Sequence, residues 1–403
     1  MSQPPDTPDI PPHARGTLLF CVVALGFAQT VLFAILAPLG REIGLPEIQI
    51  GAIISASSLT MFIASPLWGR ASDTRGRRKI LLIGLFGYSA GTILFAGVFQ
   101  AALLGLLVPA MAFIALTVAR VLNATVMAAV MPASNAYMAD ITDVAGRTRG
   151  MGALGAASNI GSMLGPAIGG LMASITLLTP LYFSALTTLI AALIALFTLP
   201  ELPKHQTAHR PPRLKYTDPR ILPFVIVGIF LFMGFAIVQQ TIAFRFQDIL
   251  HLTAADTARM VGISMMLSAG ASLFVQMLVI PRLEVSPFTL LRIAMPMVIV
   301  AFAIMAVAQT QSLLTTAMII QGFGMGLAGP AFMAGASLAV SGEEQGMVAG
   351  VASSCPPLGF TIGPILGTAL YSLEPSLPYW FACAIYVGLA IFTLISKGGK
   401  AHG

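Results

Sequence analysis

The sequence predicts an all-α membrane protein in which twelve transmembrane helices form two pseudo-symmetric six-helix bundles. Of the 403 residues, 57% are hydrophobic and only 9% are charged, whereas a soluble domain carries about 25% charged residues. The apolar runs are about 20 residues long and lack period-two alternation, which favours membrane-spanning helices over a β-barrel. A motif in the first half of the chain also recurs in the second half, which indicates a duplication.

Twelve apolar segments are expected to cross the membrane. They lie near residues 17–39, 47–68, 79–100, 110–138, 147–172, 178–199, 221–245, 257–280, 287–308, 311–338, 345–372 and 377–396. The polar stretch between the sixth and seventh segments divides them into two groups. We therefore expect an N-terminal tail (1–16), a first bundle (17–199), a cytoplasmic linker (200–220), a second bundle (221–396) and a C-terminal tail (397–403).

The basic residues are concentrated in alternate loops. Most follow even-numbered spans or lie in the linker and tails, whereas Arg41, Arg245 and Arg259 lie near the opposite side. The positive-inside rule then places both termini in the cytoplasm. Because no aromatic residues are interleaved with these loop charges, the net charge of +6 does not predict a nucleic-acid partner. Short loops and a high Ala and Gly content favour a bacterial inner membrane.

Neither a cofactor nor a metal site is expected. His205 and His209 are four residues apart, but they lie in a proline-rich linker without further ligands. The glycine pattern at Gly324, Gly326 and Gly329 lies within an apolar span and not after a strand, so it does not predict a dinucleotide site. Cys21, Cys355 and Cys383 all fall in apolar runs and are expected to be core residues.

The fifth span carries an unusual glycine and proline pattern. Gly161, Gly165 and Gly169 are spaced by four and share one helix face, on which a second helix can pack closely. Pro166 removes a backbone donor and is expected to bend the helix. We predict that the whole motif forms a helix interface: Gly152, Gly161, Gly165, Pro166, Gly169 and Gly170.

The eleventh span repeats this pattern. Gly359, Gly363 and Pro364 have the same spacing, and Gly363 lies 198 positions after Gly165. The same offset joins Asn123 to Gln321 and Pro132 to Pro330, which pairs the fourth span with the tenth. We therefore include Gly359, Gly363 and Pro364 in the predicted interface motif.

At these residues, and at two further motifs, the chain resembles the major facilitator superfamily and, within it, the twelve-span drug:proton antiporters. The loop after span two has the spacing of the family's first signature, at Gly69, Asp73, Gly76, Arg77 and Arg78. In the fourth span, Arg120 is followed by Asn123 and Ala124, where the family has Gln and Gly. The resemblance covers essentially the whole chain.

The resemblance assigns roles to these residues. It implies that Asp73 latches the two halves by meeting the start of span eleven, with Gly69, Gly76, Arg77 and Arg78 shaping the loop. It links Arg120 to proton coupling, and we add Asn123 and Asp140 as coupling candidates. It also pairs span five with span eight, whose small residues include Gly262 and Gly270, and span two with span eleven.

In this family spans one, four, seven and ten line the passage. They offer Gln29, Phe33, Asn123, Met127, Gln239, Gln240, Gln321 and Met325 as substrate-cavity candidates. Amides among Met and Phe suit a small amphipathic substrate. For any single Met, a core or lipid-facing position is the competing interpretation. Arg245 and Asp248 could pair or meet substrate at the mouth, although we favour an interfacial anchor.

The sequence therefore predicts a secondary active transporter that works by alternating access and is not an enzyme. The resemblance implies proton-coupled export of small amphipathic compounds or drugs by a monomer in the lipid bilayer. No Asp or Glu lies deep in any span, however, and a proton carrier is normally a buried acid or His. Two alternatives follow: a metabolite or siderophore transporter or facilitator without proton antiport, and a non-transporting sensor or scaffold.

Overall fold

The computed structural model describes residues 13–143, 146–202, 217–283, 285–340 and 344–395, which form helices and no strands. The first half contains α1 (Ala14–Glu42), α2 (Glu47–Arg75), α3 (Arg77–Leu103), α4 (Pro109–Met127), α5 (Val130–Asp140), α6 (Arg147–Met172) and α7 (Thr179–Thr198). The second contains α8 (Leu222–Leu250), α9 (Ala254–Phe274), α10 (Pro287–Val307), α11 (Gln311–Leu338), α12 (Gln345–Ala352), α13 (Cys355–Leu373) and α14 (Leu377–Ile395).

All twelve predicted spans correspond to helical segments. Eleven of the described segments are long and apolar enough to cross a membrane, and the exception is the glycine-rich α6. Most of the predicted linker and tails lies outside the described residues. After α9 the helix continues as a π-helical turn, Val275–Val279, and a 3₁₀ turn, Ile280–Arg282.

Two of the predicted spans are each broken into two helices, and in both the break lies shortly before a proline. The fourth span divides into α4 and α5 at Ala128–Ala129, four residues before Pro132, and the eleventh divides into α12 and α13 just before Pro356 and Pro357. Proline has no N–H to donate to the carbonyl four residues earlier, so the helix is weakest at that point. The sequence prediction treated both spans as continuous helices.

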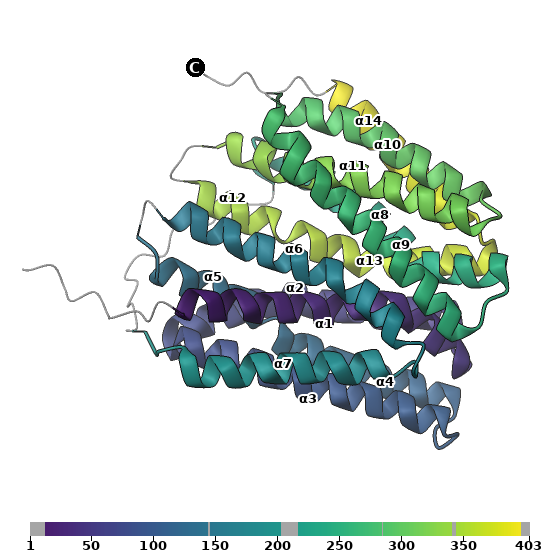
Figure 1. The fold of residues 1–403 in the computed structure, drawn as a ribbon. Helices are drawn as coiled ribbons and strands as arrows, with labels where there is room; N and C mark the ends of the chain where they lie inside the picture. The colour runs from purple at the N-terminus through teal and green to yellow at the C-terminus, as the bar shows by residue number, and fades with distance from the viewer. Residues whose placement is uncertain (1–12, 144–145, 203–216, 284, 341–343, 396–403) are drawn as a thin grey trace, which may run out of the picture.

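Figure 1 shows α1 to α7 on one side of the bundle and α8 to α14 on the other, with all spans roughly aligned. Helix α1 begins and α14 ends at the same end, which we call the termini end. Helices α1 and α8 both finish at the opposite end, which we call the far end. The two halves meet mainly where α2 lies against α13 and α6 lies against α9.

The glycine face of α6 packs against α1. A Cβ on Gly161 would lie 2.9 Å from the backbone nitrogen of Phe27, and one on Gly165 would lie 2.6 Å from the Phe27 carbonyl oxygen. Pro166 cannot donate to the carbonyl of Ser162, and the Thr30 hydroxyl of α1 donates to that oxygen instead, at 3.0 Å. The proline therefore leaves the Ser162 carbonyl without its usual donor in the helix, and the Thr30 hydroxyl of α1 replaces that donor.

The second half repeats this packing. A Cβ on Gly359 would lie 2.6 Å from the backbone nitrogen of Met233, and one on Gly363 would lie 2.8 Å from the Met233 carbonyl oxygen. Both contacts join α13 to α8. The predicted repeat therefore describes a three-dimensional feature, because each motif helix lies against the first helix of its own half.

Contacts between the halves use residues of α6 and α13 that lie next to the glycine stripe. A Cβ on Gly170 of α6 would lie 2.5 Å from the Ala258 carbonyl oxygen of α9 and 3.0 Å from the Cα of Gly262. In the second copy Thr368 replaces this glycine, and Gly51 of α2 supplies the small surface beneath it. The Ser55 hydroxyl of α2 also accepts a hydrogen bond from the Ile365 N–H at 3.1 Å.

Two details of the predicted interface are corrected. The stripe of Gly161, Gly165 and Gly169 packs on α1 within its own half, whereas contacts with span eight include the adjacent positions Pro166 and Gly170. A Cβ on Gly152 would meet nothing within 4 Å, so this glycine is not packed in an interface. The residue lies near the termini end of α6, where the close approach to α1 and α9 has ended.

Gly161 and Gly152 provide a matched test of this packing. We expect Gly161→Ala to lower the apparent melting temperature of the detergent-purified protein by at least about 2 °C, because the added methyl overlaps α1 backbone atoms. Gly152→Ala should leave the melting temperature unchanged or raise it, because Ala favours the helix by about 1 kcal/mol and meets no neighbour. Equal effects of the two substitutions would contradict the packing described above.

Candidate functional site

An ion-paired cluster closes the space between the two halves at the far end. The Arg41 guanidinium of α1 donates to Asp248 of α8 at 2.5 Å and to Glu47 of α2 at 2.7 Å. The Tyr371 hydroxyl of α13 donates to the same Asp248 carboxylate at 2.6 Å. The guanidinium also lies over the Phe244 ring, 4.7 Å from its centroid. This cluster therefore joins two helices of each half, α1 and α2 with α8 and α13.

The contacts of this cluster are directional but can be broken. Charge-assisted, two-pronged contacts between arginine and carboxylate are strong and directional. The side chains remain partly open to solvent, however, with 22% of Arg41 and 39% of Asp248 exposed. Such a pair is screened and contributes modestly, so it can form and break during a conformational cycle.

Aromatic side chains meet at the interface between the halves. The Phe360 ring of α13 lies 5.9 Å from Phe33 of α1 and 6.1 Å from Phe235 of α8, measured between centroids. Tilted and edge-to-face rings at these distances attract one another. The contact of Phe33 with Phe360 joins the halves without any charge.

Each half presents the same set of chemical groups beside these rings. On α1, Gln29 lies one turn from Phe33, and its amide points at the sulfur of Met61 at 3.9 Å. On α8, Gln239 lies one turn from Phe235, and its amide points at the sulfur of Met265 at 3.7 Å. Both glutamines and both phenylalanines are partly exposed. We call Gln29, Phe33, Phe235, Gln239 and Phe360 the central lining.

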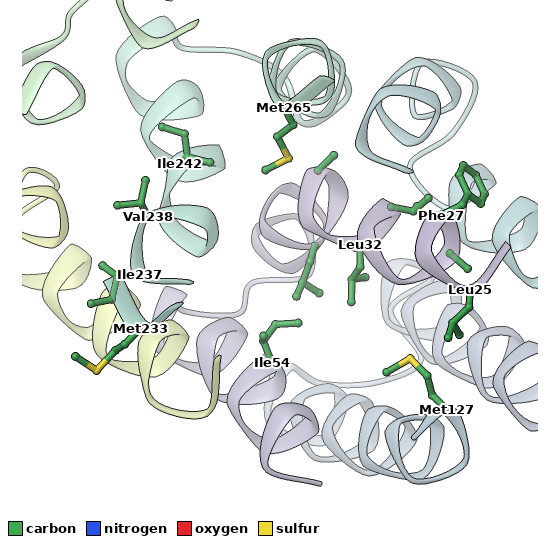
Figure 2. Packing of buried hydrophobic residues seen from close by; sticks show 14 of the residues in the cluster. Leu25, Phe27, Leu32, Ile54, Met127, Met233, Ile237, Val238, Ile242 and Met265 are labelled. Carbon is green, nitrogen blue, oxygen red and sulfur yellow. The ribbon is translucent and has the colours of Figure 1, made fainter. Parts of the chain in front are cut away.

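The remaining predicted cavity residues are buried or bonded within one half. Asn123 is only 1% exposed, and its amide donates to Thr92 of α3 at 3.0 Å. This contact contradicts its predicted place in the cavity. Gln321, Gln240 and Met127 are also buried, and Met127 belongs to the hydrophobic cluster in Figure 2. Met325 is partly exposed and its sulfur accepts from Tyr386 at 3.5 Å.

Arg120 is buried inside the first half. It is 7% exposed and interacts with the Tyr88 hydroxyl of α3, and its Nε atom has no hydrogen-bond partner among the described residues. A buried guanidinium normally has more partners than this. Arg120 therefore remains a candidate for proton coupling. Like Asn123, however, it lies against α3 of its own half.

Arg245 and Asp248 do not pair with each other. Arg245 is buried and donates to the Ala306 carbonyl oxygen at 2.7 Å, so it lies inside its own half and not at the membrane interface. Asp248 faces Arg41 across the interface instead. No local sequence pattern predicts this contact, because Arg41 and Asp248 lie 207 positions apart. Their equivalent places, at the ends of the first helix of each half, are the signal that could have found it.

At the termini end the described ion pairs stay within one half. Arg77 pairs with Asp73 and, at 3.1 Å, with Asp140, while Arg220 pairs with Asp218 and Glu344. Gly76 has φ +104°, which explains why glycine is needed there. Among the described contacts, none joins Asp73 to α12 or α13. Within the described residues, the latch expected from the resemblance is not seen.

Two repeated six-helix groups that meet along a polar and aromatic seam are the architecture of secondary membrane transporters. The family model described as Major Facilitator Superfamily matches residues 18–355. The chain belongs to this superfamily; it is a membrane transporter and not an enzyme.

The comparisons with individual proteins agree. The chain is 27% identical to Multidrug resistance protein 1 of Bacillus subtilis, over 90% of each chain. It is 29% identical to Multidrug resistance protein 2 of the same organism, over 87% of this chain and 86% of the relative. Its fold is similar to that of a D-xylose-proton symporter, with a TM-score of 0.73, 16% identity, and coverage of 95% of this chain and 98% of the other.

The far-end cluster can be tested by removing one charge. We expect Asp248→Asn to shift the balance toward a separated far end by about fivefold, because the Arg41 contact is worth about 1 kcal/mol at this exposure. Spin labels on the exposed Leu106 and Ser312, in a background without native cysteines, should then report a larger population of long distances. Glu374→Gln, an acid at the same end that contacts Ser376, should leave the distances unchanged. An identical distribution for wild type and Asp248→Asn would remove Asp248 from the gate.

Proposed function

We propose that the protein exports small amphipathic compounds, including drugs, across a bacterial inner membrane in exchange for protons. The central lining carries this proposal, because both halves present an amide, an aromatic ring and a thioether toward the same region. Such a surface offers few directional contacts and many adaptable ones, which suits several related substrates. The similarity to two multidrug resistance proteins supports the same substrate class.

The charge distribution supports a cytoplasmic position for the termini end. Its exposed basic residues include Arg70, Arg75, Arg147, Arg149 and Arg282, and positively charged loops remain in the cytoplasm. In this orientation the far-end cluster is the outer gate. The conformation described here then has a closed outer side, and substrate enters from the cytoplasm.

Alternating access requires the opposite end to close when the outer gate opens. We propose that Asp73 then leaves Arg77 for the start of span eleven, as the resemblance implies. An anion is favoured at a helix N-terminus, and Arg77 would retain Asp140 as a partner. Arg77 would thus bind both Asp73 and Asp140 in one state, and Asp73 would form the latch in the other.

Proton coupling is assigned to the carboxylates at the gates. No described span carries an Asp or Glu beside the central lining, and Asp248 is an interface acid that binds the opposite half. Protonation of Asp248 would remove the charge that holds Arg41, which couples proton binding to gate opening. Because no carboxylate lies at the centre, a facilitator of the same fold that uses no proton is the second candidate.

Dye accumulation tests the substrate class and the central lining together. Bacteria that lack their own drug pumps should accumulate less ethidium when they express the wild-type protein. The double variant Gln29→Ala, Gln239→Ala should lose at least about half of this effect, since both amides are removed. Gln311→Ala, an exposed residue at the start of α11, is the control and should behave as wild type. No wild-type effect across a broad panel of dyes and drugs would exclude the export of drugs.

Purified protein in liposomes distinguishes the two candidate functions. An imposed pH gradient should drive dye against its concentration gradient if protons are exchanged, and collapse of that gradient should stop net accumulation. Flux that equilibrates the dye and ignores the pH gradient would identify a facilitator. The same assay tests the latch: Asp73→Asn should slow turnover, whereas Asp143→Asn, a neighbouring acid that caps Gly146, should not.

A further inference from the structure

A groove lies between α2 and α4 near the termini end, outside the seam between the halves. It encloses about 470 Å³, which is within the range of ~300–1,000 Å³ found for small-molecule sites. Leu67, Trp68 and Ala71 of α2 and Thr125 of α4 form its apolar part, and Arg70 and Arg75 border it at the end of α2. None of these residues belongs to the central lining or to the gates.

The groove opens toward the lipid. On α2, Ile63 and Leu67 lie one turn apart and are 57% and 58% exposed. On α4, Val118 and Leu122 are 53% and 55% exposed, and Thr125 lies on the same helix face. Apolar side chains with this exposure on membrane-spanning helices face acyl chains. A molecule in the groove would therefore arrive from the bilayer and not from the transport pathway.

The apolar part of the groove is held in shape by one hydrogen bond. The Trp68 indole N–H donates to the Thr125 backbone carbonyl at 2.6 Å, which fixes the ring between the two helices. The Thr125 hydroxyl donates to the Val121 carbonyl at 2.8 Å, so it needs no partner in the groove. The remaining wall is small at Ala71, which leaves room for a hydrocarbon chain.

Two arginines at its border have no side-chain partner among the described residues. Arg70 and Arg75 are exposed and form no ion pair within the described residues, whereas the neighbouring Arg77 has two carboxylates. Both lie where α2 leaves its apolar stretch, at the depth of phospholipid head groups. Guanidinium groups bind phosphate with paired hydrogen bonds, and basic pockets between transmembrane helices are typical lipid head-group sites.

We propose that this groove binds one anionic phospholipid of the surrounding bilayer. Its phosphate lies between Arg70 and Arg75, and one acyl chain lies along Leu67, Trp68 and Ala71. A zwitterionic lipid fits the apolar wall equally well but leaves the two positive charges only partly neutralised. The site thus selects lipids by charge. This proposal is independent of which substrate the protein transports.

Native mass spectrometry of the full chain in detergent tests the proposal directly. Phosphatidylglycerol and phosphatidylcholine with identical chains are the probes. We expect one phosphatidylglycerol to be retained at concentrations where phosphatidylcholine is not. Arg70→Gln, Arg75→Gln should weaken this binding by about fivefold for each arginine, roughly twenty-fivefold together. Arg147→Gln, Arg149→Gln removes two exposed arginines from α6 at the same end and should change it less than twofold.

A second variant tests the chain-binding wall without a change in charge. Ala71→Phe fills the groove beside Trp68 and should reduce phosphatidylglycerol retention while the protein elutes as wild type in gel filtration. Equal retention of the two lipids would overturn the proposal, as would equal losses in the two double-arginine variants, which would indicate diffuse charge attraction. Unchanged binding in Ala71→Phe would also overturn it, because the lipid would then not occupy the groove.

Discussion

Close backbone approach at glycine is the constraint on which the rest of this structure depends. Inside a bilayer, apolar side chains gain little by leaving lipid, so helices associate through tight packing and shared hydrogen bonds. Gly161 and Gly165 bring α6 onto α1, and Gly359 and Gly363 bring α13 onto α8. Each pair carries one helix that contacts the opposite half. The position of the interface therefore follows from contacts made within each half.

Each motif helix, α6 and α13, uses one face to pack within its own half and an adjacent face to contact the opposite half. One face, lined by the glycine stripe, is packed permanently within its half. The adjacent positions Gly170 and Thr368 meet α9 and α2 across the interface. Small side chains allow this close approach, and the described ion pair between the halves, Arg41 with Asp248, is partly exposed. A rigid half and a lightly bonded interface are what a rocking mechanism requires.

The central lining combines polar and apolar groups without a buried charge. Gln29 and Gln239 offer amides, and the three phenylalanines offer flat apolar faces, while charges remain at the two ends of the interface. In the proposed function, this separation would place substrate recognition at the centre and electrostatic control at the two ends. Arg120 and Arg245 both lie inside their own halves, against α3 and the end of α10.

The sequence by itself determined the membrane class, the twelve spans and the duplicated halves, because length, hydropathy and glycine spacing are local properties of a helix. It also located Gln29, Phe33 and Gln239 on the correct spans. Only the tertiary structure decided which face of each helix meets a partner: Asn123 faces α3, Gly152 faces no neighbour, and Asp248 meets Arg41 instead of Arg245. The rotation of a helix about its axis depends on all neighbouring helices at once, and so does the pairing of two residues 207 positions apart. A local sequence pattern therefore predicts neither.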